Sequence, residues 1–244
     1  MKTRISIKRK LAERGKGQQE NYQPYIKARE ISDIGTANNI VDWKHGRTVE
    51  LLSEGEAYLY YLLRWHDDVT DIREQFPLKL EETNCIADLL QIERVNRGRD
   101  CMTTDMLVTF ANGKEQAFSV KYSRKATEQN RTVEKLYIEK MYWNRKNIPW
   151  HLVYKTDLPE IKIQNIRQCV KYYDVGNVHD DISLVKHLIA RKMIIVDMNQ
   201  PINFTSLCGF YKKELEQWKK LQSINLISYV PEMNDIESYI SKTT

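Results

Sequence analysis

The stretch that decides the fold is TDMLVTFANGKEQAFSVK, residues 104–121. It begins as an apolar strand with an acid, Asp105, near its start. Asn112-Gly113 in its middle favours a tight hairpin turn. The second half is typical of the returning strand, in which Ser119 and Lys121 lie on the same face. The pattern therefore predicts a hairpin that brings an acid and a lysine together on neighbouring strands.

An acid and a lysine in this arrangement suit a metal site that acts on phosphodiesters. Mg²⁺ takes oxygen ligands, and a lysine beside it can stabilise developing charge. Asp105 is the best candidate ligand, because an acid in a buried strand needs a partner. Val120 would add its backbone carbonyl. The alternative is a structural ion pair between Asp105 and Lys121 on a sheet edge, and the spacing alone does not decide between the two.

A third candidate lies upstream, at the start of a predicted helix. Ser53 followed by Glu56 has the spacing of a capping box. The helix continues to about His66 and is apolar on most sides. A carboxylate on its first turn could point at the same metal. On the residues alone, simple capping is the better interpretation of Glu56.

The surrounding segments predict an α/β sandwich, a mixed sheet with helices on both faces. Strands are expected over residues 69–75 and 150–154, a further hairpin over 39–44 and 47–52, and helices over 53–66, 83–95 and 132–146. From residue 159 onward short helical segments dominate: 159–173, 180–191, 203–209 and 211–222. An extended pair, residues 194–196 and 226–230, predicts a small hairpin or wing.

These features predict two domains. Residues 1–160 form the mixed-sheet domain with an N-terminal arm, and residues 161–244 form a smaller, mostly helical domain. The arm is basic: residues 1–16 hold seven Lys or Arg and the single acid Glu13, which gives +6, whereas the whole chain carries +5. Such an arm suits phosphate contact, and a solubilising tail is an equally good alternative. Its candidate DNA-binding residues are Lys8, Arg9, Lys10 and Arg14.

Composition argues against several classes of protein. No apolar run is long enough for a membrane span, and the N-terminus lacks the apolar stretch of a signal peptide. The four cysteines lie far apart without a CxxC pair, which disfavours a zinc site or disulfides and favours a reducing cytosol. The histidines show no HExxH spacing and there is no Gly-rich phosphate loop. We therefore expect a cytoplasmic protein that contacts no membrane.

Several blocks, in a fixed order, carry a family resemblance. They are LSEGE (52–56), DIREQFPL (71–78), TDMLV (104–108), Val120-Lys121, RTVEKL (131–136), and the stretch from Tyr142-Trp143 to Ile148-Pro149-Trp150. With them the chain resembles the TnsA family, the restriction-endonuclease-like subunit of heteromeric Tn-seven-type transposases. The resemblance covers most of residues 20–155. The block 71–78 is long enough to be specific, whereas the Asp-to-Lys motif alone is not.

The resemblance implies a restriction-endonuclease-like fold of the PD-(D/E)xK type and assigns roles to single residues. The family's catalytic acids fall on Glu56 and Asp105, and its catalytic lysine falls on Lys121. The family has Gln two positions before that lysine, where this chain has Ser119. A hydroxyl is a shorter and poorer ligand, so we expect Ser119 to act through a water or not to ligate. Glu139 matches a family acid near the active centre, although a solvated helical charge is its simpler interpretation.

The resemblance also implies an activity and partners. It implies that the chain cuts the 5′ ends of a transposon in DNA. For such a cut the chemistry of the phosphodiester calls for one or two Mg²⁺ ions, for which Mn²⁺ could substitute. A TnsB-like DDE transposase cuts and joins the 3′ ends. The family's C-terminal part is winged-helix-like and contacts a TnsC-like AAA+ ATPase regulator, which residues 161–244 fit by length and helix content.

Two alternatives remain beside a transposase endonuclease. A stand-alone restriction or repair nuclease of the same fold would need its own recognition domain, and the chain has no long additional one. A non-catalytic adaptor for DNA ends would not need Glu56, Asp105 and Lys121 together.

Overall fold

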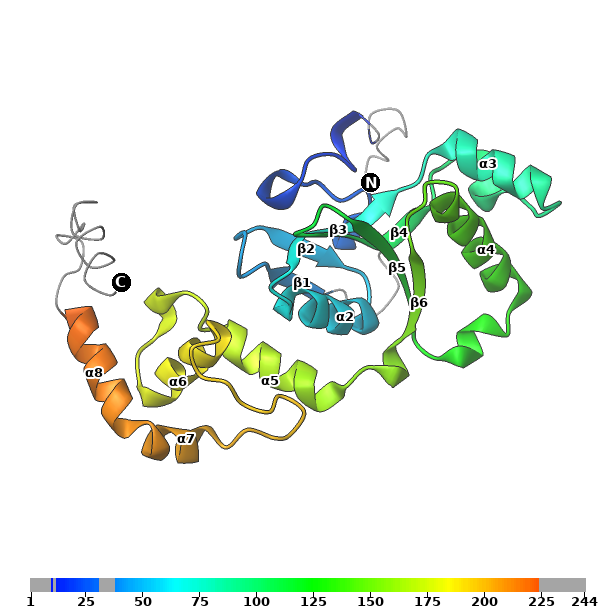
Figure 1. Cartoon of the computed structure of the whole chain (residues 1–244). Coiled ribbons are helices and arrows are strands. Elements are labelled where there is room, and N and C mark those ends of the chain that lie inside the picture. Colours follow the sequence, from blue (N-terminus) through cyan, green and yellow to red (C-terminus); the bar gives the residue numbers. More distant parts are fainter. Residues whose placement is uncertain (1–9, 11, 31–37, 224–244) are drawn as a thin grey trace, which may run out of the picture. The chain divides into compact units, whose positions relative to one another are not determined.

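The computed structural model describes residues 10, 12–30 and 38–223, which form two compact units, Met1–Arg167 and Gln168–Thr244 (Figure 1). The first unit is built on a four-stranded sheet with the order β3-β4-β5-β6. Its strands are β3 (Val69–Pro77), β4 (Thr103–Phe110), β5 (Glu115–Lys121) and β6 (Trp150–Tyr154). β3, β4 and β5 pair antiparallel, whereas β6 runs parallel to β5. The predicted mixed sheet is therefore confirmed.

The hairpin predicted for residues 104–121 is present as β4 and β5. Gly113 has a φ of +76°, which favours glycine, and the Asn112 side chain accepts the Lys114 N–H at 2.9 Å. The ladder runs from Thr109↔Glu115 to Met106↔Phe118. Both strands continue beyond that last pair, and the sequence-predicted site lies in this continuation.

Each face of the sheet carries its own hydrophobic core, because β4 and β5 alternate between the two faces. Met106 and Val108 pack on one side with α2 (Glu54–Trp65) and the hairpin of β1 (Asn38–Val41) and β2 (Thr48–Leu51). Leu107 packs on the other side with α3 (Leu80–Leu89) and α4 (Asn130–Asn144). Figure 1 shows α2 on one face and α3 and α4 on the other, as the sequence predicts.

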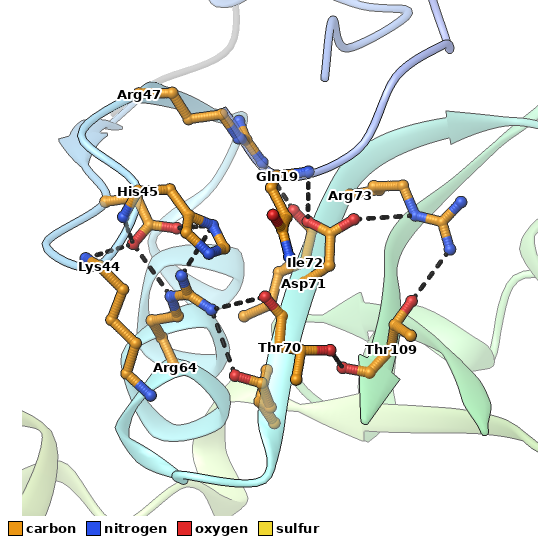
Figure 2. A network of polar contacts seen from close by, with 12 residues as sticks. Gln19, Lys44, His45, Arg47, Arg64, Thr70, Asp71, Ile72, Arg73 and Thr109 are labelled. Atoms are coloured by element: carbon orange, nitrogen blue, oxygen red, sulfur yellow. Dashed lines mark hydrogen bonds and ion pairs between the residues drawn. The ribbon is translucent and has the colours of Figure 1, made fainter. Parts of the chain in front are cut away.

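One buried ion pair and two hydrogen bonds of Arg64 fix the end of α2 to neighbouring segments (Figure 2). Arg64, in the last turn of α2, is fully buried and donates to Asp42 at 2.9 Å. The same guanidinium donates to the carbonyls of Val69 and Thr70 at the start of β3. Because an unpaired buried charge is costly, these contacts hold the C-terminal end of α2 against β3. The candidate site lies at the other end of α2.

The N-terminal segment folds along the edge strand β3. Tyr25 N–H donates to the Gln75 carbonyl at 3.3 Å, and Tyr22 Oη donates to the Glu74 carbonyl at 2.9 Å. Gly15 has a φ of +69°, and a Cβ there would lie 2.2 Å from Pro77 Cγ. An exposed edge strand is prone to pair with other chains, and this segment covers it.

One predicted helix is shorter than its sequence pattern indicates. The helix expected over residues 83–95 is α3, which ends at Leu89. Gln91 follows with a φ of 56°, a left-handed conformation that cannot continue a helix. Val95–Gly98 forms a separate 3-10 turn, in which Asn96 and Arg97 are also left-handed.

The second unit is helical in the part of the chain that the structure describes. α5 (Glu160–Val170) leads into it, and α6 (Asp181–Ala190), α7 (Phe204–Phe210) and α8 (Lys212–Ser223) follow. The strand predicted over residues 194–196 is wrong, because these residues have no regular structure. Its expected partner, residues 226–230, lies outside the described residues, so the winged-helix-like detail stays a prediction. None of the helices described here is long and apolar enough to cross a membrane.

Candidate active site

The peptide of Val120 is held from both sides by the predicted acid and lysine. The Val120 N–H donates to Asp105 Oδ2 at 2.6 Å. The Val120 carbonyl accepts from Lys121 Nζ at 2.9 Å. A side chain of β4 thus takes the place of a backbone acceptor beyond the last ladder pair, and the structure brings Asp105, Val120 and Lys121 together as predicted.

Glu56 reaches this site from the first turn of α2. Ser53 caps the helix, since its Oγ accepts the Glu56 N–H at 3.2 Å, which confirms the capping interpretation. The Glu56 side chain also turns inward, and the residue is only 6% exposed. It accepts from Leu52 N at 2.9 Å, Ser53 Oγ at 3.0 Å and Gln75 Nε2 at 3.1 Å. Glu56 is therefore both part of the cap and a buried acid of the site.

Gly55 allows the start of α2 to lie against β5. A Cβ at Gly55 would lie 2.9 Å from Val120 Cγ1 and 3.2 Å from Lys155 Cβ. Real Cβ atoms do not approach other atoms so closely, so a side chain here would push the helix away. The absence of a side chain at position 55 therefore lets the first turn of α2, which carries Glu56, lie this close to Val120.

The three acids Glu56, Asp105 and Glu139 all have raised pKa values, because their surroundings disfavour the charged form. Burial, and then the charge of Asp105, raise the pKa of Glu56 to about 8. Burial also raises the pKa of Asp105, against the opposing effects of Lys121 and the Val120 N–H. Burial, and then Asp105, raise the pKa of Glu139 to about 7. Negative charge in this cluster is thus undercompensated by the protein, which is common at functional sites.

Glu139 is a member of this cluster and not a solvated helical charge, which corrects the simpler interpretation. It lies in α4, is 4% exposed, and accepts hydrogen bonds from Thr104 Oγ1 and from Ser119 Oγ, the latter at 2.5 Å. Trp143 Nε1 donates to Thr104 Oγ1 at 2.7 Å. Ser119 is 2% exposed and donates its hydroxyl proton to Glu139, which supports a role in holding that acid over a role as ligand.

The donors assembled here are oxygens of the kind that a hard divalent cation binds. They are the carboxylates of Glu56 and Asp105 and the carbonyl of Val120. No group of three His, Cys, Asp or Glu side chains in the described residues is arranged to hold a metal by itself. Mg²⁺ is commonly held by one or two carboxylates with waters completing its shell. The raised pKa values of both acids fit a site whose charge a cation would neutralise.

The predicted DNA-binding arm divides into two parts. Lys8 and Arg9 lie outside the described residues. Lys10 is half-buried, with Nζ 4.2 Å from the centre of the Tyr25 ring. Arg14 is 6% exposed and pairs with both Glu30 carboxylate oxygens at 2.7 and 2.8 Å. The prediction for Arg14 therefore needs correction, because a buried and paired guanidinium does not present its charge to DNA.

Sequence reasoning missed Gln75, whose side chain holds Glu56. Gln75 lies in the block 71–78 that carries the family resemblance. That block was the available signal, but nothing in it marks which of its residues faces the site.

A domain with this mixed sheet, these flanking helices and this acid–lysine pair is restriction-endonuclease-like. Residues 66–155 match the family model described as "TnsA-like endonuclease N terminal". The chain is also similar to the transposon Tn7 transposition protein TnsA of Escherichia coli, with 36% identity over 166 residues, 66% of this chain and 61% of that protein. Residues 66–155 therefore form a TnsA-like endonuclease domain.

Proposed function

We propose that this chain is a Mg²⁺-dependent DNA endonuclease subunit of a transposase. It hydrolyses the phosphodiester at the 5′ ends of the transposon during cut-and-paste transposition. The observation that carries the proposal is the Val120 peptide, which joins an acid and a lysine beside the buried Glu56. The match of residues 66–155 to the TnsA-like family model and the similarity to TnsA support the same interpretation.

Each residue of the site has a role in this proposal. Glu56, Asp105 and the Val120 carbonyl would hold Mg²⁺, which when bound neutralises phosphate charge and makes water a better nucleophile. Lys121 has three N–H donors, of which one goes to Val120 at 2.9 Å. The others can hold a water or a phosphate oxygen near the same point. Ser119 and Thr104 orient Glu139, whose raised pKa of about 7 suits proton exchange near neutral pH.

The partners of the complex are also part of the proposal. A DDE transposase of the TnsB type cuts and joins the 3′ ends, and an AAA+ ATPase of the TnsC type regulates assembly. We assign the contact with that regulator to the helical C-terminal domain. All of these partners act on DNA in the cytoplasm.

The test maps the two strand cuts separately. The chain is incubated with Mg²⁺, DNA that carries transposon ends, and the DDE transposase encoded beside it. We expect 5′ cuts that require this chain and 3′ cuts that require its partner. Efficient, sequence-specific cleavage by this chain alone would indicate a stand-alone nuclease instead. If both cuts still form when this chain is omitted, the chain would be a non-catalytic adaptor.

The basic arm should contribute affinity through its first residues. Replacing Lys8 and Arg9 together by Gln is expected to weaken DNA binding and to reduce the slope of log affinity against log salt by up to about 1.8, since each phosphate contact adds about 0.9. Fluorescence anisotropy at several salt concentrations measures this slope.

A double substitution of Lys212 and Lys213 by Gln removes the same charge from α8 and serves as the matched control. We expect it to leave the slope nearly unchanged. Equal slopes for the wild type and the Lys8/Arg9 variant would make the arm a solubilising tail.

A further inference from the structure

Gln75 has a backbone conformation that is unusual for its residue type. It lies inside β3, is 1% exposed, and has a φ of 47°. Left-handed conformations of residues other than glycine are uncommon, and Asn and Gly adopt them most readily. Where such strain persists in a folded protein, it frequently marks a functional position. The contacts of Gln75 show what its conformation achieves.

The amide of Gln75 is oriented at both ends. Its Nε2 donates to Glu56 Oε2 at 3.1 Å, and its Oε1 accepts from Thr103 Oγ1 at 3.1 Å. A carboxylate only accepts, so the amide nitrogen faces Glu56, and the amide oxygen takes the proton of the Thr103 hydroxyl. The start of α2 already holds the Glu56 carboxylate, through Leu52 N–H at 2.9 Å and Ser53 Oγ at 3.0 Å. The Gln75 bond adds a contact from the sheet.

The strand around Gln75 is held firmly in place. The Gln75 carbonyl accepts from Tyr25 N, and the Glu74 carboxylate pairs with Arg47 at 2.6 and 2.8 Å. Earlier in β3, Gln19 N donates to Asp71 at 3.1 Å and Arg47 donates to the Ile72 carbonyl at 2.6 Å, as Figure 2 shows. The N-terminal segment and the β1–β2 hairpin therefore stabilise the conformation in which the Gln75 side chain reaches Glu56.

We propose that Gln75 is a positioning residue of Glu56: its amide completes, from the sheet side, the set of hydrogen bonds that fixes how the Glu56 carboxylate meets a divalent metal. This inference rests on the proposed function. The hydrogen bond from Gln75 goes to a proposed metal ligand, Glu56, so its effect should be on metal affinity. Residues that orient metal ligands typically contribute 10- to 100-fold to that affinity.

The test measures binding of Mn²⁺ to the full chain by isothermal titration calorimetry, without DNA, so that the readout is independent of cleavage. Gln75→Asn keeps an amide and tolerates a left-handed φ, but it is one methylene too short to reach Glu56. We expect about tenfold weaker Mn²⁺ binding, and thermal unfolding, which the loss of two buried hydrogen bonds should shift to a lower temperature, checks that the variant is folded. Gln75→Gly removes the backbone strain completely and should show the same loss of affinity.

Two further variants make the result decisive. Gln23→Asn applies the same change to an exposed glutamine of the N-terminal segment and should leave Mn²⁺ binding unchanged. Glu56→Gln should abolish tight binding. Wild-type affinity in both Gln75 variants, with loss in Glu56→Gln, overturns this inference and leaves the proposed function standing. Absence of Mn²⁺ binding in the wild type overturns the proposed function and this inference with it.

Discussion

Replacing Asp105 by Asn is expected to slow DNA cleavage by about 10³-fold or more, while the fold is preserved. Asn retains an oxygen that can accept the Val120 N–H, which now lies 2.6 Å from Asp105 Oδ2. It removes the negative charge that would hold the metal. Metal ions contribute several kcal/mol of transition-state stabilisation, and each loss of about 1.36 kcal/mol slows the reaction tenfold.

Gel assays with Mg²⁺, the partner transposase and end-bearing DNA measure this effect, and thermal unfolding checks the fold. Asp88→Asn is the matched control, because Asp88 forms an exposed ion pair with Arg94 in another part of the domain. We expect this control to cleave at the wild-type rate. Cleavage by Asp105→Asn at that same rate would remove Asp105 from the site.

Local sequence patterns predicted the parts of the site that depend on neighbouring residues. The Asn112-Gly113 turn fixes the hairpin, so the approach of Asp105 to Val120 follows from strand alternation and turn chemistry. The Ser53–Glu56 spacing likewise predicted where α2 begins. The family resemblance then gave Glu56 a role that its capping position alone did not indicate.

Long-range packing determines the parts that were missed or misjudged. Glu139 looked like a surface charge because nothing near it in sequence shows that α4 lies over Thr104 and Ser119. Arg14 looked like a DNA contact because its partner Glu30 lies outside the basic run. Gln75 reaches Glu56 because its own backbone is left-handed within a strand, a conformation that no strand propensity favours. In each case the burial of a polar group depends on a distant segment.

Without metal, the protein should lose stability as the pH rises from about 4.5 to about 8. Glu56 has an ordinary pKa of 4.5 and a folded-state pKa raised to about 8 by burial and by Asp105. The folded state therefore holds its proton more tightly than the unfolded chain. The stabilisation that comes from this tighter proton binding is fully present below the pKa of Glu56 in the unfolded chain. It is lost as the pH rises to the pKa of Glu56 in the folded protein. By linkage the loss is on the order of 3 kcal/mol, and Glu139 acts in the same direction.

Denaturant unfolding at pH 5 and pH 8, with and without Mg²⁺, measures this dependence. Glu56→Gln should flatten it, whereas Glu54→Gln, on the same turn but exposed and paired with Lys155, should not. A wild type whose pH dependence equals that of Glu56→Gln would contradict the prediction. Mg²⁺ should restore stability at pH 8, because a ligand that binds only the folded state stabilises it. Asp105→Asn should also be more stable than the wild type at pH 8 without metal. The charge that we expect cleavage to require is thus one that destabilises the metal-free fold.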